Sequence, residues 1–314
     1  MSILITGAGG HVGRALVAHL AGTGARVIAT DLAPPPDLPE GVAFERLDVT
    51  VTDPDRVIGA QKPQVVVHLA SVVTPPPGFT DAMAYKVDVT GTRHVLDACE
   101  RHGVRRLVVT SSGAAYGYHP ENLRGPLRED APLRGNDAFA YARHKRLVEE
   151  MLAQARGQPP EQVVLRVGTV LGPGLENQIT ALFHKPRPLA VTGSDSPFVF
   201  IWIDDLVAVL ARAAGDGPAG IFNVAGDGAP GIAALAAVMG KRVRRLPPGL
   251  LRAALTLARP LGLTRYGPEQ LGFLQYRPVL DNTALKAAFG YTPRLTSLQA
   301  FELWWQDAQR RMEQ

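Results

Sequence analysis

Cysteine is almost absent from the 314-residue sequence, because Cys99 is the only one. No disulfide can form within the chain, and redox catalysis by a cysteine pair is excluded. Cys99 stands in a run of helical character, which predicts a buried structural thiol. No uncharged apolar run reaches the roughly 18 residues that a membrane-spanning helix needs, and the first residues lack the pattern of a signal peptide. We therefore expect a cytoplasmic protein that does not enter a membrane.

An excess of one charge is also missing. The 33 Lys and Arg residues and the 29 Asp and Glu residues give a net charge of +4. The two signs are mixed along the chain, with short basic clusters at 105–106 and 241–242. Nucleic-acid binding requires a concentrated basic surface, so we expect no nucleic-acid partner. The eight histidines show no metal-ligand spacing, which predicts a protein without a metal site.

Apolar residues make up 46% of the chain, enough for a large core. In the first half they form short runs suited to strands buried on both faces of a sheet, separated by longer amphipathic segments. This alternation predicts a Rossmann-type, doubly wound α/β fold with a parallel sheet. Strands are predicted at residues 2–6, 26–30, 43–47, 65–69, 107–110 and 163–167, and helices at 12–20, 53–60, 82–101 and 138–155.

From about residue 171, glycine and proline divide the sequence into shorter pieces, which predicts a smaller, interleaved substrate domain. Residues 250–263 are predicted to form a helix packed on that domain. The alternative, a helix lying on a membrane surface, is disfavoured because Pro260 interrupts the segment. The predicted division is a dinucleotide-binding domain at 1–170, a return to it at 198–224 with a helix at 201–213 and a strand at 220–224, and substrate-domain segments at 171–197 and 225–314.

A glycine-rich segment, TGAGGHVG, lies between the first predicted strand and the first predicted helix. Its first glycine permits the tight turn, the third lets the backbone approach a pyrophosphate, and the last lets the helix pack closely on the sheet. The free amides at the helix start then face the phosphates of a dinucleotide. The residues expected at the phosphates are Gly7, Gly10, His11, Val12 and Gly13.

Asp31 ends the second predicted strand, where a ribose-binding acid belongs. A carboxylate there accepts hydrogen bonds from the ribose hydroxyls and repels a 2′-phosphate, which predicts NAD rather than NADP. Arg14 and Arg26 are the nearest basic residues that would upset this preference, and a turn acid is the alternative role for Asp31. Further cofactor contacts are expected at Asp48 and Val49 for adenine, and at Leu69, Ala70 and Ser71 for the ribose and pyrophosphate.

Six motifs follow one another along the chain. They are TGAGGHVG at 6–13, HLA at 68–70, VTGT at 89–92, SSGAAYG at 111–117, YARHK at 141–145 and LR at 165–166. In this order they resemble the extended short-chain dehydrogenase family, also called the NAD-dependent epimerase/dehydratase family. The resemblance covers roughly residues 1–210 well and 276–293 less specifically. It implies an enzyme that uses NAD.

Tyr141 and Lys145 are four residues apart in a predicted helix, so both stand on one face. A neighbouring ammonium favours the phenolate, and we expect Lys145 to bring the pKa of Tyr141 down from about 10 toward a range useful for proton transfer. The family resemblance implies that Lys145 also holds the nicotinamide ribose. It further implies that Ser112 hydrogen-bonds the substrate oxygen. The predicted catalytic residues are Ser112, Tyr141 and Lys145.

The role of the serine and the position of the neighbouring histidine each need a choice between alternatives. Thr110 and Ser111 compete for the serine role, but Ser112 matches the family position four residues before Tyr116. His144 stands next to the catalytic lysine, and we expect it on the protein surface, on a different side of the helix from the catalytic tyrosine.

Several positions depart from the family pattern. Asp88 stands where the family usually has asparagine, so the polar contact made there is in doubt. Gly113 follows the predicted catalytic serine where 4,6-dehydratases carry an acidic residue, which disfavours dehydration. Phe198 and Thr169 replace an arginine and an asparagine that are common in sugar-nucleotide enzymes. These losses favour a less charged substrate. The predicted substrate-binding residues are Ser112, Gly113, Thr169, Phe198 and Trp202.

The leading function hypothesis is a dehydrogenase or reductase that acts on a secondary alcohol or ketone of a small, partly apolar molecule. One alternative is a sugar-nucleotide epimerase that uses transient oxidation by NAD, with Arg187, Arg212 and Arg277 as possible diphosphate ligands. Another is a dinucleotide-sensing protein without catalysis. The resemblance also implies a homodimer that packs through the predicted helices at 82–101 and 138–155.

Overall fold

Seven parallel strands form the central sheet of the computed structural model, which describes residues 1–76, 78–258, 260–261 and 267–313. Their order, β10-β6-β5-β4-β1-β2-β3, is the doubly wound, Rossmann-type order, and it confirms the predicted fold class. All six strands predicted in the first half are present, and β10 is the strand predicted at 220–224. The bounds are β1 Ser2–Thr6, β2 Arg26–Asp31, β3 Ala43–Arg46, β4 Val65–His68, β5 Arg106–Ser112, β6 Glu161–Val167 and β10 Gly220–Val224.

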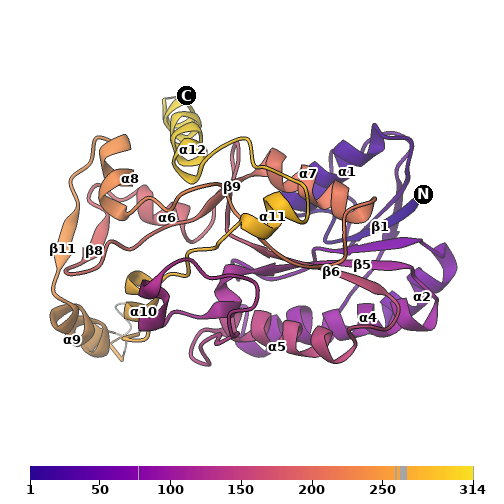
Figure 1. Cartoon of the computed structure of the whole chain (residues 1–314), viewed down its shortest axis with the longest axis horizontal. Helices are drawn as coiled ribbons and strands as arrows, with labels where there is room; N and C mark the ends of the chain where they lie inside the picture. Colours follow the sequence, from indigo (N-terminus) through magenta and orange to yellow (C-terminus); the bar gives the residue numbers. More distant parts are fainter. Residues whose placement is uncertain (77, 259, 262–266, 314) are drawn as a thin grey trace.

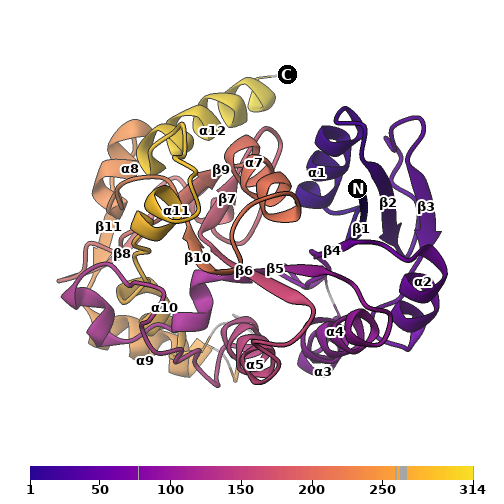
Figure 2. The ribbon, with the colours of Figure 1, turned by 45° about the vertical axis from the view of Figure 1, so that its right-hand side comes forward.

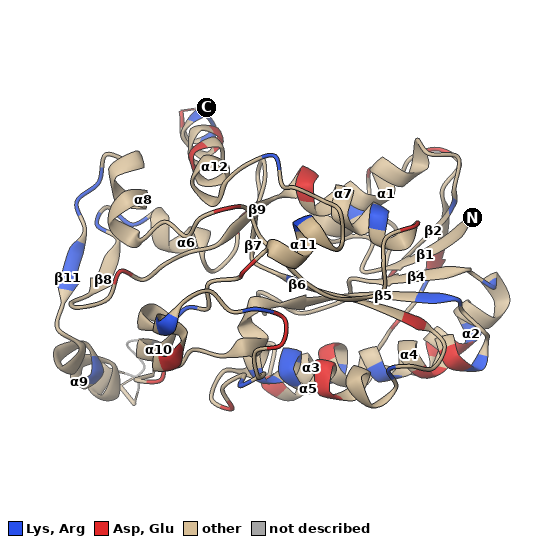
Figure 3. Cartoon of the chain, in the orientation of Figure 1, with Lys and Arg blue, Asp and Glu red and all other residues tan. Residues whose placement is uncertain are grey.

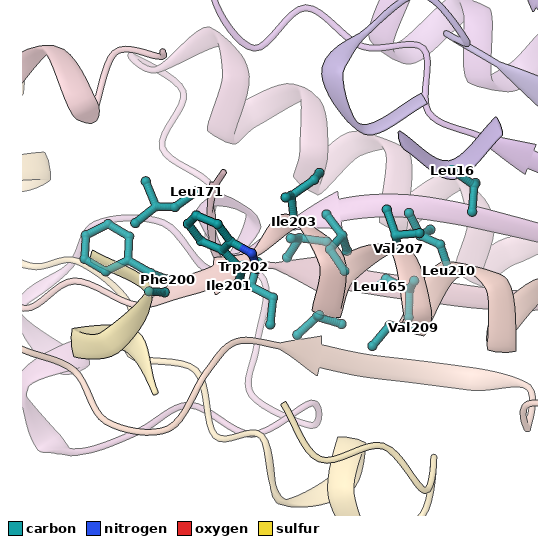
Figure 4. Packing of buried hydrophobic residues seen from close by; sticks show 14 of the residues in the cluster. Leu16, Leu165, Leu171, Phe200, Ile201, Trp202, Ile203, Val207, Val209 and Leu210 are labelled. Atoms are coloured by element: carbon teal, nitrogen blue, oxygen red, sulfur yellow. The ribbon is translucent and has the colours of Figure 1, made fainter. Parts of the chain in front are cut away.

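Helices cover both faces of this sheet (Figures 1 and 2). Alternate residues of a strand point to opposite faces, so Ile3 and Ile5 of β1 belong to one core and Leu4 to the other. Figure 4 shows part of the first core, where Val207 and Leu210 lie close to strand residues of the sheet. The covering helices are α1 (His11–Ala21) and α7 (Ile203–Ala214) on one face, and α2 (Asp53–Gln61), α4 (Gly91–Arg101) and α5 (Ala140–Gln154) on the other.

The helix predicted at 82–101 is not a regular α-helix. It consists of α3 (Asp81–Tyr85), a π-helical turn at Lys86–Thr90 and α4, which follow one another without a break. A π-helical turn shifts the residues that follow it relative to an α-helix and often marks a functional site. Here the turn carries Asp88, whose side chain is buried.

The helix predicted at 201–213 begins two residues later than expected, at Ile203. The preceding residues form strand β9 (Phe200–Trp202), which pairs in parallel with β7 (Thr169–Leu171). All three residues of β9 are buried, and their aromatic and β-branched side chains favour a strand. The second small sheet pairs β8 (Leu189–Val191) with β11 (Arg244–Leu246).

The other helices lie mainly at the end of the molecule away from the N-terminus (Figure 1).

Cys99 is fully buried as predicted, and burial raises the pKa of its thiol. Acidic and basic residues are interspersed on the outer helices α2, α4 and α5 (Figure 3). No helix within the described ranges is long and apolar enough to cross a membrane. The remaining helices are α6 (Thr180–Phe183), α8 (Ile232–Val238), α9 (Pro248–Ala258), α10 (Gln270–Gln275), α11 (Thr283–Ala287) and α12 (Ser297–Met312), with 3-10 turns at Gly113–Tyr116 and Pro120–Arg124.

The predicted helix at 250–263 corresponds to α9, which begins at Pro248 and is described as far as Ala258. Leu251 of α9 packs with Val191 and Leu271 in a small core, so this part of the helix lies on the protein as expected. Residues 259, 262 and 263 of the predicted segment lie outside the described residues.

Candidate active site

The backbone of the glycine loop between β1 and α1 lies so close to neighbouring backbone that side chains would not fit at two of its glycines. Gly7 has φ +69°, and a Cβ there would lie 2.7 Å from the backbone nitrogen of Ala70. A Cβ on Gly13 would lie 2.1 Å from the carbonyl oxygen of Gly7. Gly10 caps α1, so the amides of the first helical turn, from His11 onward, have no acceptors within the helix. These features fit a dinucleotide whose pyrophosphate rests on the helix start.

Asp31 lies directly against this loop at the end of β2. Its carboxylate accepts hydrogen bonds from the backbone N–H of Gly9 at 2.9 Å and of Leu32 at 2.7 Å. The two nearest arginines, Arg14 and Arg26, are engaged elsewhere. Arg14 pairs with the carboxylate of Asp37 at 3.2 Å, and Arg26 donates to the side chain of Gln61 at 2.6 Å. The carboxylate of Asp31 therefore keeps the environment expected for NAD.

The predicted adenine residues follow β3. Asp48 accepts hydrogen bonds from the N–H and hydroxyl of Thr50 at 2.9 and 2.7 Å, which fixes a local turn. Val49 packs against Gly91 of α4, where a Cβ would lie 2.8 Å from its Cγ2. Both residues follow the end of β3, so they lie at the carboxyl edge of the sheet, where ligands bind in folds of this kind. Their contact with adenine stays a prediction.

The predicted ribose and pyrophosphate residues follow β4. The backbone N–H groups of Leu69 and Ala70 donate to the hydroxyl of Thr6 at 3.2 and 3.4 Å, which ties this segment to the end of β1. Ser71 donates its hydroxyl to Asp88 at 2.8 Å. The segment therefore forms one wall beside the glycine loop.

The three predicted catalytic residues come together at the end of β5 and the start of α5. The Ser112 side chain lies close enough to the Tyr141 hydroxyl to favour its phenolate. Lys145 Nζ lies 5.6 Å from the centre of the Tyr141 ring and donates to the carbonyl oxygen of Thr110 at 3.0 Å. Ser111 is turned away, because its hydroxyl donates to Glu149 at 2.5 Å. This arrangement supports Ser112 over the two competing hydroxyl residues.

The expectation that Lys145 lowers the pKa of Tyr141 is wrong for the protein alone. Burial raises the pKa of Tyr141 to about 12, the hydrogen bond from Ser112 opposes this rise, and the charge of Asp88 adds to it. Lys145 is itself buried, and burial lowers the pKa of its amine. Sequence spacing predicts which groups meet, but desolvation depends on the packing around them.

His144 is buried, so the prediction of a surface histidine is wrong. Its side chain has 0% exposure. Nδ1 lies 3.1 Å from a carboxylate oxygen of Asp88, and Nε2 lies 3.2 Å from one of Asp81. The ring of Tyr85 packs edge-on against it at 5.5 Å. The physical reason is that α3 and the π-helical turn cover this side of α5.

Asp88 retains a polar contact of the kind that was in doubt. Its carboxylate accepts from Ser71 Oγ at 2.8 Å, from the N–H of Val72 at 2.9 Å and from His144. Burial alone would raise the pKa of Asp88, but the hydrogen bond from His144, the charge of Lys145 and the other two donors hold this pKa below its usual range. An aspartate where the family usually has asparagine was the feature of the sequence that could have indicated a buried hydrogen-bond donor, here His144, beside Asp88.

A buried ion pair behind the catalytic residues was not predicted. Glu149, on α5, forms two-point contacts with Arg166 of β6, the shortest at 2.7 Å, and both side chains are at most 3% exposed. Arg166 also donates to the hydroxyl of Tyr116 at 2.7 Å. Glu149 follows Lys145 by four residues, and this spacing was the available signal. The pair fixes β6 to α5 beneath the site.

The predicted substrate residues Phe198 and Trp202 are both buried. Phe198 stacks on Phe200 with a centroid distance of 5.7 Å and an interplanar angle of 8°. The guanidinium carbon of Arg277 also lies over the Phe198 ring, 3.9 Å from its centre. Trp202 packs within the main core (Figure 4), and its Nε1 lies 3.3 Å from Asp204. Phe198 thus contacts a charged group, whereas Trp202 contacts mainly apolar side chains.

Gly113 directly follows the predicted catalytic residue Ser112 at the end of β5, and Thr169 begins β7 just after β6. The N–H of Thr169 donates to the carbonyl oxygen of Val199 at 3.0 Å. Gly113 lies under Leu280, whose Cδ2 would be 3.1 Å from a Cβ at this position. The contact of these two residues with substrate stays a prediction.

The glycine loop, the acid that ends β2 and the Ser–Tyr–Lys cluster together define a dinucleotide-dependent oxidoreductase site. The chain belongs to the NAD dependent epimerase/dehydratase family, whose model matches residues 3–225. It is therefore an enzyme, and its cofactor is NAD. The hypothesis of a dinucleotide-sensing protein without catalysis is set aside.

Individual relatives differ in activity. The chain is 29% identical over 322 residues to the UDP-glucose 4-epimerase of Mycolicibacterium smegmatis, with 94% of each chain covered. It is 29% identical over 188 residues to the 2-alkyl-3-oxoalkanoate reductase of Stenotrophomonas maltophilia, with 60% of this chain and 56% of the reductase covered. The crystal structure of the Thermus thermophilus UDP-glucose 4-epimerase complex with NAD matches with a TM-score of 0.75 at 24% identity, over 98% of this chain and 99% of that chain. This last likeness shows the fold.

Proposed function

We propose that the protein transfers a hydride between NAD and a secondary alcohol, or the corresponding ketone, of a small, partly apolar substrate. The observation that carries this proposal is the juxtaposition of Ser112 and Tyr141, with Lys145 Nζ 5.6 Å from the centre of the Tyr141 ring. The similarity to a 2-alkyl-3-oxoalkanoate reductase adds support. When bound, NAD accepts or returns the hydride, and its oxidised nicotinamide adds a positive charge that favours a phenolate.

The residues of the chain handle the proton. In the oxidation direction, the Ser112 hydroxyl donates to the substrate oxygen and holds it at Tyr141. The Tyr141 phenolate oxygen takes the hydroxyl proton of the substrate, and the Ser112 side chain favours this phenolate. In the reduction direction, the Tyr141 hydroxyl returns this proton to the ketone oxygen.

A substrate panel tests this proposal. Purified protein is assayed at 340 nm with NAD or NADP and secondary alcohols, and with NADH and the matching ketones. We expect turnover of at least one alcohol–ketone pair, with NAD strongly preferred because of Asp31. Conversion of UDP-glucose to UDP-galactose without net NADH release, in the absence of any turnover in the panel, would refute the proposal.

The epimerase alternative has one specific observation in its favour, the similarity to a UDP-glucose 4-epimerase over 94% of both chains. The geometry around the diphosphate candidates gives it little support. Arg187 is exposed to solvent. Arg212 donates to the carbonyl oxygen of Phe289 at 2.8 Å and pairs with Asp216. Only one of the three proposed diphosphate ligands, Arg277, lies in the aromatic surroundings of the predicted substrate side.

The charge of Asp88 leads to a pH prediction. This carboxylate raises the pKa of Tyr141, so Asp88→Asn should lower that pKa. Oxidation needs the phenolate, which exists only above the pKa of the phenol. The rising limb of kcat/KM for alcohol oxidation should therefore move to lower pH in Asp88→Asn. The measurement is a pH profile with a substrate found in the panel.

Asp81→Asn is the matched control for this experiment. Asp81 contacts the same histidine, His144, but its side chain is 57% exposed and does not affect the pKa of Tyr141 appreciably. We expect an unchanged pH profile for this variant. A shift of equal size in both variants would show that His144 geometry, and not the charge of Asp88, sets the profile.

We further propose that the protein is a homodimer that packs through α4 and α5. Met83 and Tyr85, on α3 beside these helices, are 46% and 41% exposed, more than large apolar side chains usually are. The mass in solution, measured by light scattering, decides this point. A mass of one chain at micromolar concentration would contradict the proposal.

A further inference from the structure

Arg277 is a buried cation between two aromatic rings. The residue is 7% exposed. Its guanidinium carbon lies 3.9 Å from the ring centre of Phe198 and 4.6 Å from that of Phe273. A planar guanidinium is weakly hydrated and stacks favourably on aromatic faces, which explains how a charge is tolerated at this depth. The two rings fix the plane of the guanidinium and leave its edge for polar partners.

Among the residues that the structure describes, no carboxylate balances the charge of Arg277. Its Nη1 donates to the hydroxyl of Ser196 at 2.5 Å, but its Nε has no hydrogen-bond partner in the described part of the chain. No described carboxylate forms an ion pair with it, and the nearby Tyr118 hydroxyl stays neutral because burial raises its pKa. Burial lowers the pKa of Arg277 to about 9, which still leaves the group charged at neutral pH. A buried charge of this kind is costly unless an anion joins it.

The position of Arg277 connects it to the catalytic residues. Phe273, Tyr118 and Phe139 form an aromatic cluster, with ring centres 5.1 Å apart for Tyr118 and Phe273 and 5.2 Å for Tyr118 and Phe139. Phe139 is the residue before α5, and Tyr141 is the second residue of this helix. Tyr118 is near enough to Tyr141 for the charge of one hydroxyl to affect the other. Figures 1 and 2 show α10, the helix of Phe273, beside the purple segment that follows β5.

We propose that Arg277 binds a single carboxylate group of the substrate, so that the substrate is an apolar hydroxy acid or oxo acid. Its alcohol or ketone lies at Tyr141, its apolar body contacts the aromatic cluster, and its carboxylate pairs with the guanidinium edge. The position of the reacting end rests on the proposed function. The carboxylate site rests on Arg277 alone.

A carboxylate fits these surroundings better than a diphosphate. A diphosphate spreads two or more negative charges over two phosphates and needs several cations or amide donors. Arg277 supplies one cation, and its neighbours on both faces are aromatic carbon atoms. One carboxylate would neutralise it and can form a two-point contact with Nε and an Nη atom.

Binding of octanoate and of its neutral analogue octanamide tests this site without turnover. Titration calorimetry is run in the presence of NAD on the wild type, on Arg277→Met and on Arg277→Lys. We expect the wild type to bind octanoate at least about tenfold more tightly than octanamide. Arg277→Met should weaken octanoate binding about 30- to 100-fold and octanamide binding little, because a buried charged partner is lost. Arg277→Lys should keep part of the preference for the acid.

Arg212→Met is the matched control, because Arg212 also stacks on a phenylalanine, Phe289 at 5.8 Å, but its guanidinium is engaged by Phe289 O and Asp216. Its acid-to-amide preference should equal that of the wild type. The melting temperature separates a structural role from a binding role. Removal of an unbalanced buried charge should leave the melting temperature of Arg277→Met unchanged or higher.

Three outcomes would overturn the carboxylate site. They are equal binding of octanoate and octanamide by the wild type, an unchanged preference in Arg277→Met, and tighter Arg277-dependent binding of UDP or pyrophosphate than of octanoate. If Arg277→Met does not fold, the wild type, Arg277→Lys and the competition with UDP still decide. Arg277-dependent octanoate binding without turnover of any alcohol or ketone, acids included, would support the site and refute the proposed function.

Discussion

Tyr141→Phe should lower kcat about a thousandfold in either direction and leave the Kd for NADH unchanged within a factor of two. The Tyr141 phenol lies beside Ser112 and can exchange the substrate proton, and general acid–base catalysis of this kind contributes roughly 10²- to 10⁴-fold. Phenylalanine keeps the ring, so the packing around α5 is preserved. The measurement combines steady-state assays at 340 nm with NADH fluorescence titration.

Tyr85→Phe is the control for this prediction, because Tyr85 lies on α3, is 41% exposed and contacts His144 through its ring and not through its hydroxyl. Its kcat should remain within about twofold of the wild type. Undiminished kcat in Tyr141→Phe would remove Tyr141 from proton transfer. A raised Kd for NADH together with a lowered kcat would instead point to a disturbed cofactor site.

The parallel sheet could be predicted from the sequence because its strands are buried on both faces. Such strands are short continuous apolar runs, and the segment at 65–69, VVVHL, is an example. The glycine loop was equally readable, since Gly7 and Gly13 occupy positions where a Cβ would collide with the backbone. Local chemistry dictated these features, so no knowledge of distant contacts was needed.

The errors concern side chains whose surroundings come from distant segments. His144 is buried because α3 and the π-helical turn pack on its side of α5, about 60 residues earlier in sequence, and helical periodicity contains no information on this contact. Strand β9 was taken for the start of a helix because Ile201 and Trp202 extend the apolar pattern of α7. The pKa of Tyr141 depends on burial in the same way. The stacking of Arg277 joins α10 to the segment before β9, again a long-range contact.

The second large effect concerns the ion pair beneath the site. Glu149 and Arg166 contact each other through three nitrogen–oxygen pairs at 2.7 to 3.1 Å, and Ser111 donates to the same carboxylate. Arg166 further donates to the hydroxyl of Tyr116 and to the carbonyl oxygen of Glu129. Burial alone would lower the pKa of Arg166, but Glu149 holds it above its usual range. The carboxylate thus compensates a cation that water cannot reach.

Glu149→Gln should reduce the free energy of unfolding by about 3 to 5 kcal/mol, because it leaves the Arg166 cation buried without its counter-charge. Urea denaturation followed by tryptophan fluorescence measures this loss. Glu150→Gln, at the next residue, removes an exposed carboxylate that pairs with Arg146 at 3.1 Å and should cost less than about 1 kcal/mol. The double variant Glu149→Gln/Arg166→Gln should be more stable than the sum of the single effects predicts, since it removes both charges. Equal losses in Glu149→Gln and Glu150→Gln would show that the buried pair contributes no more than a surface pair.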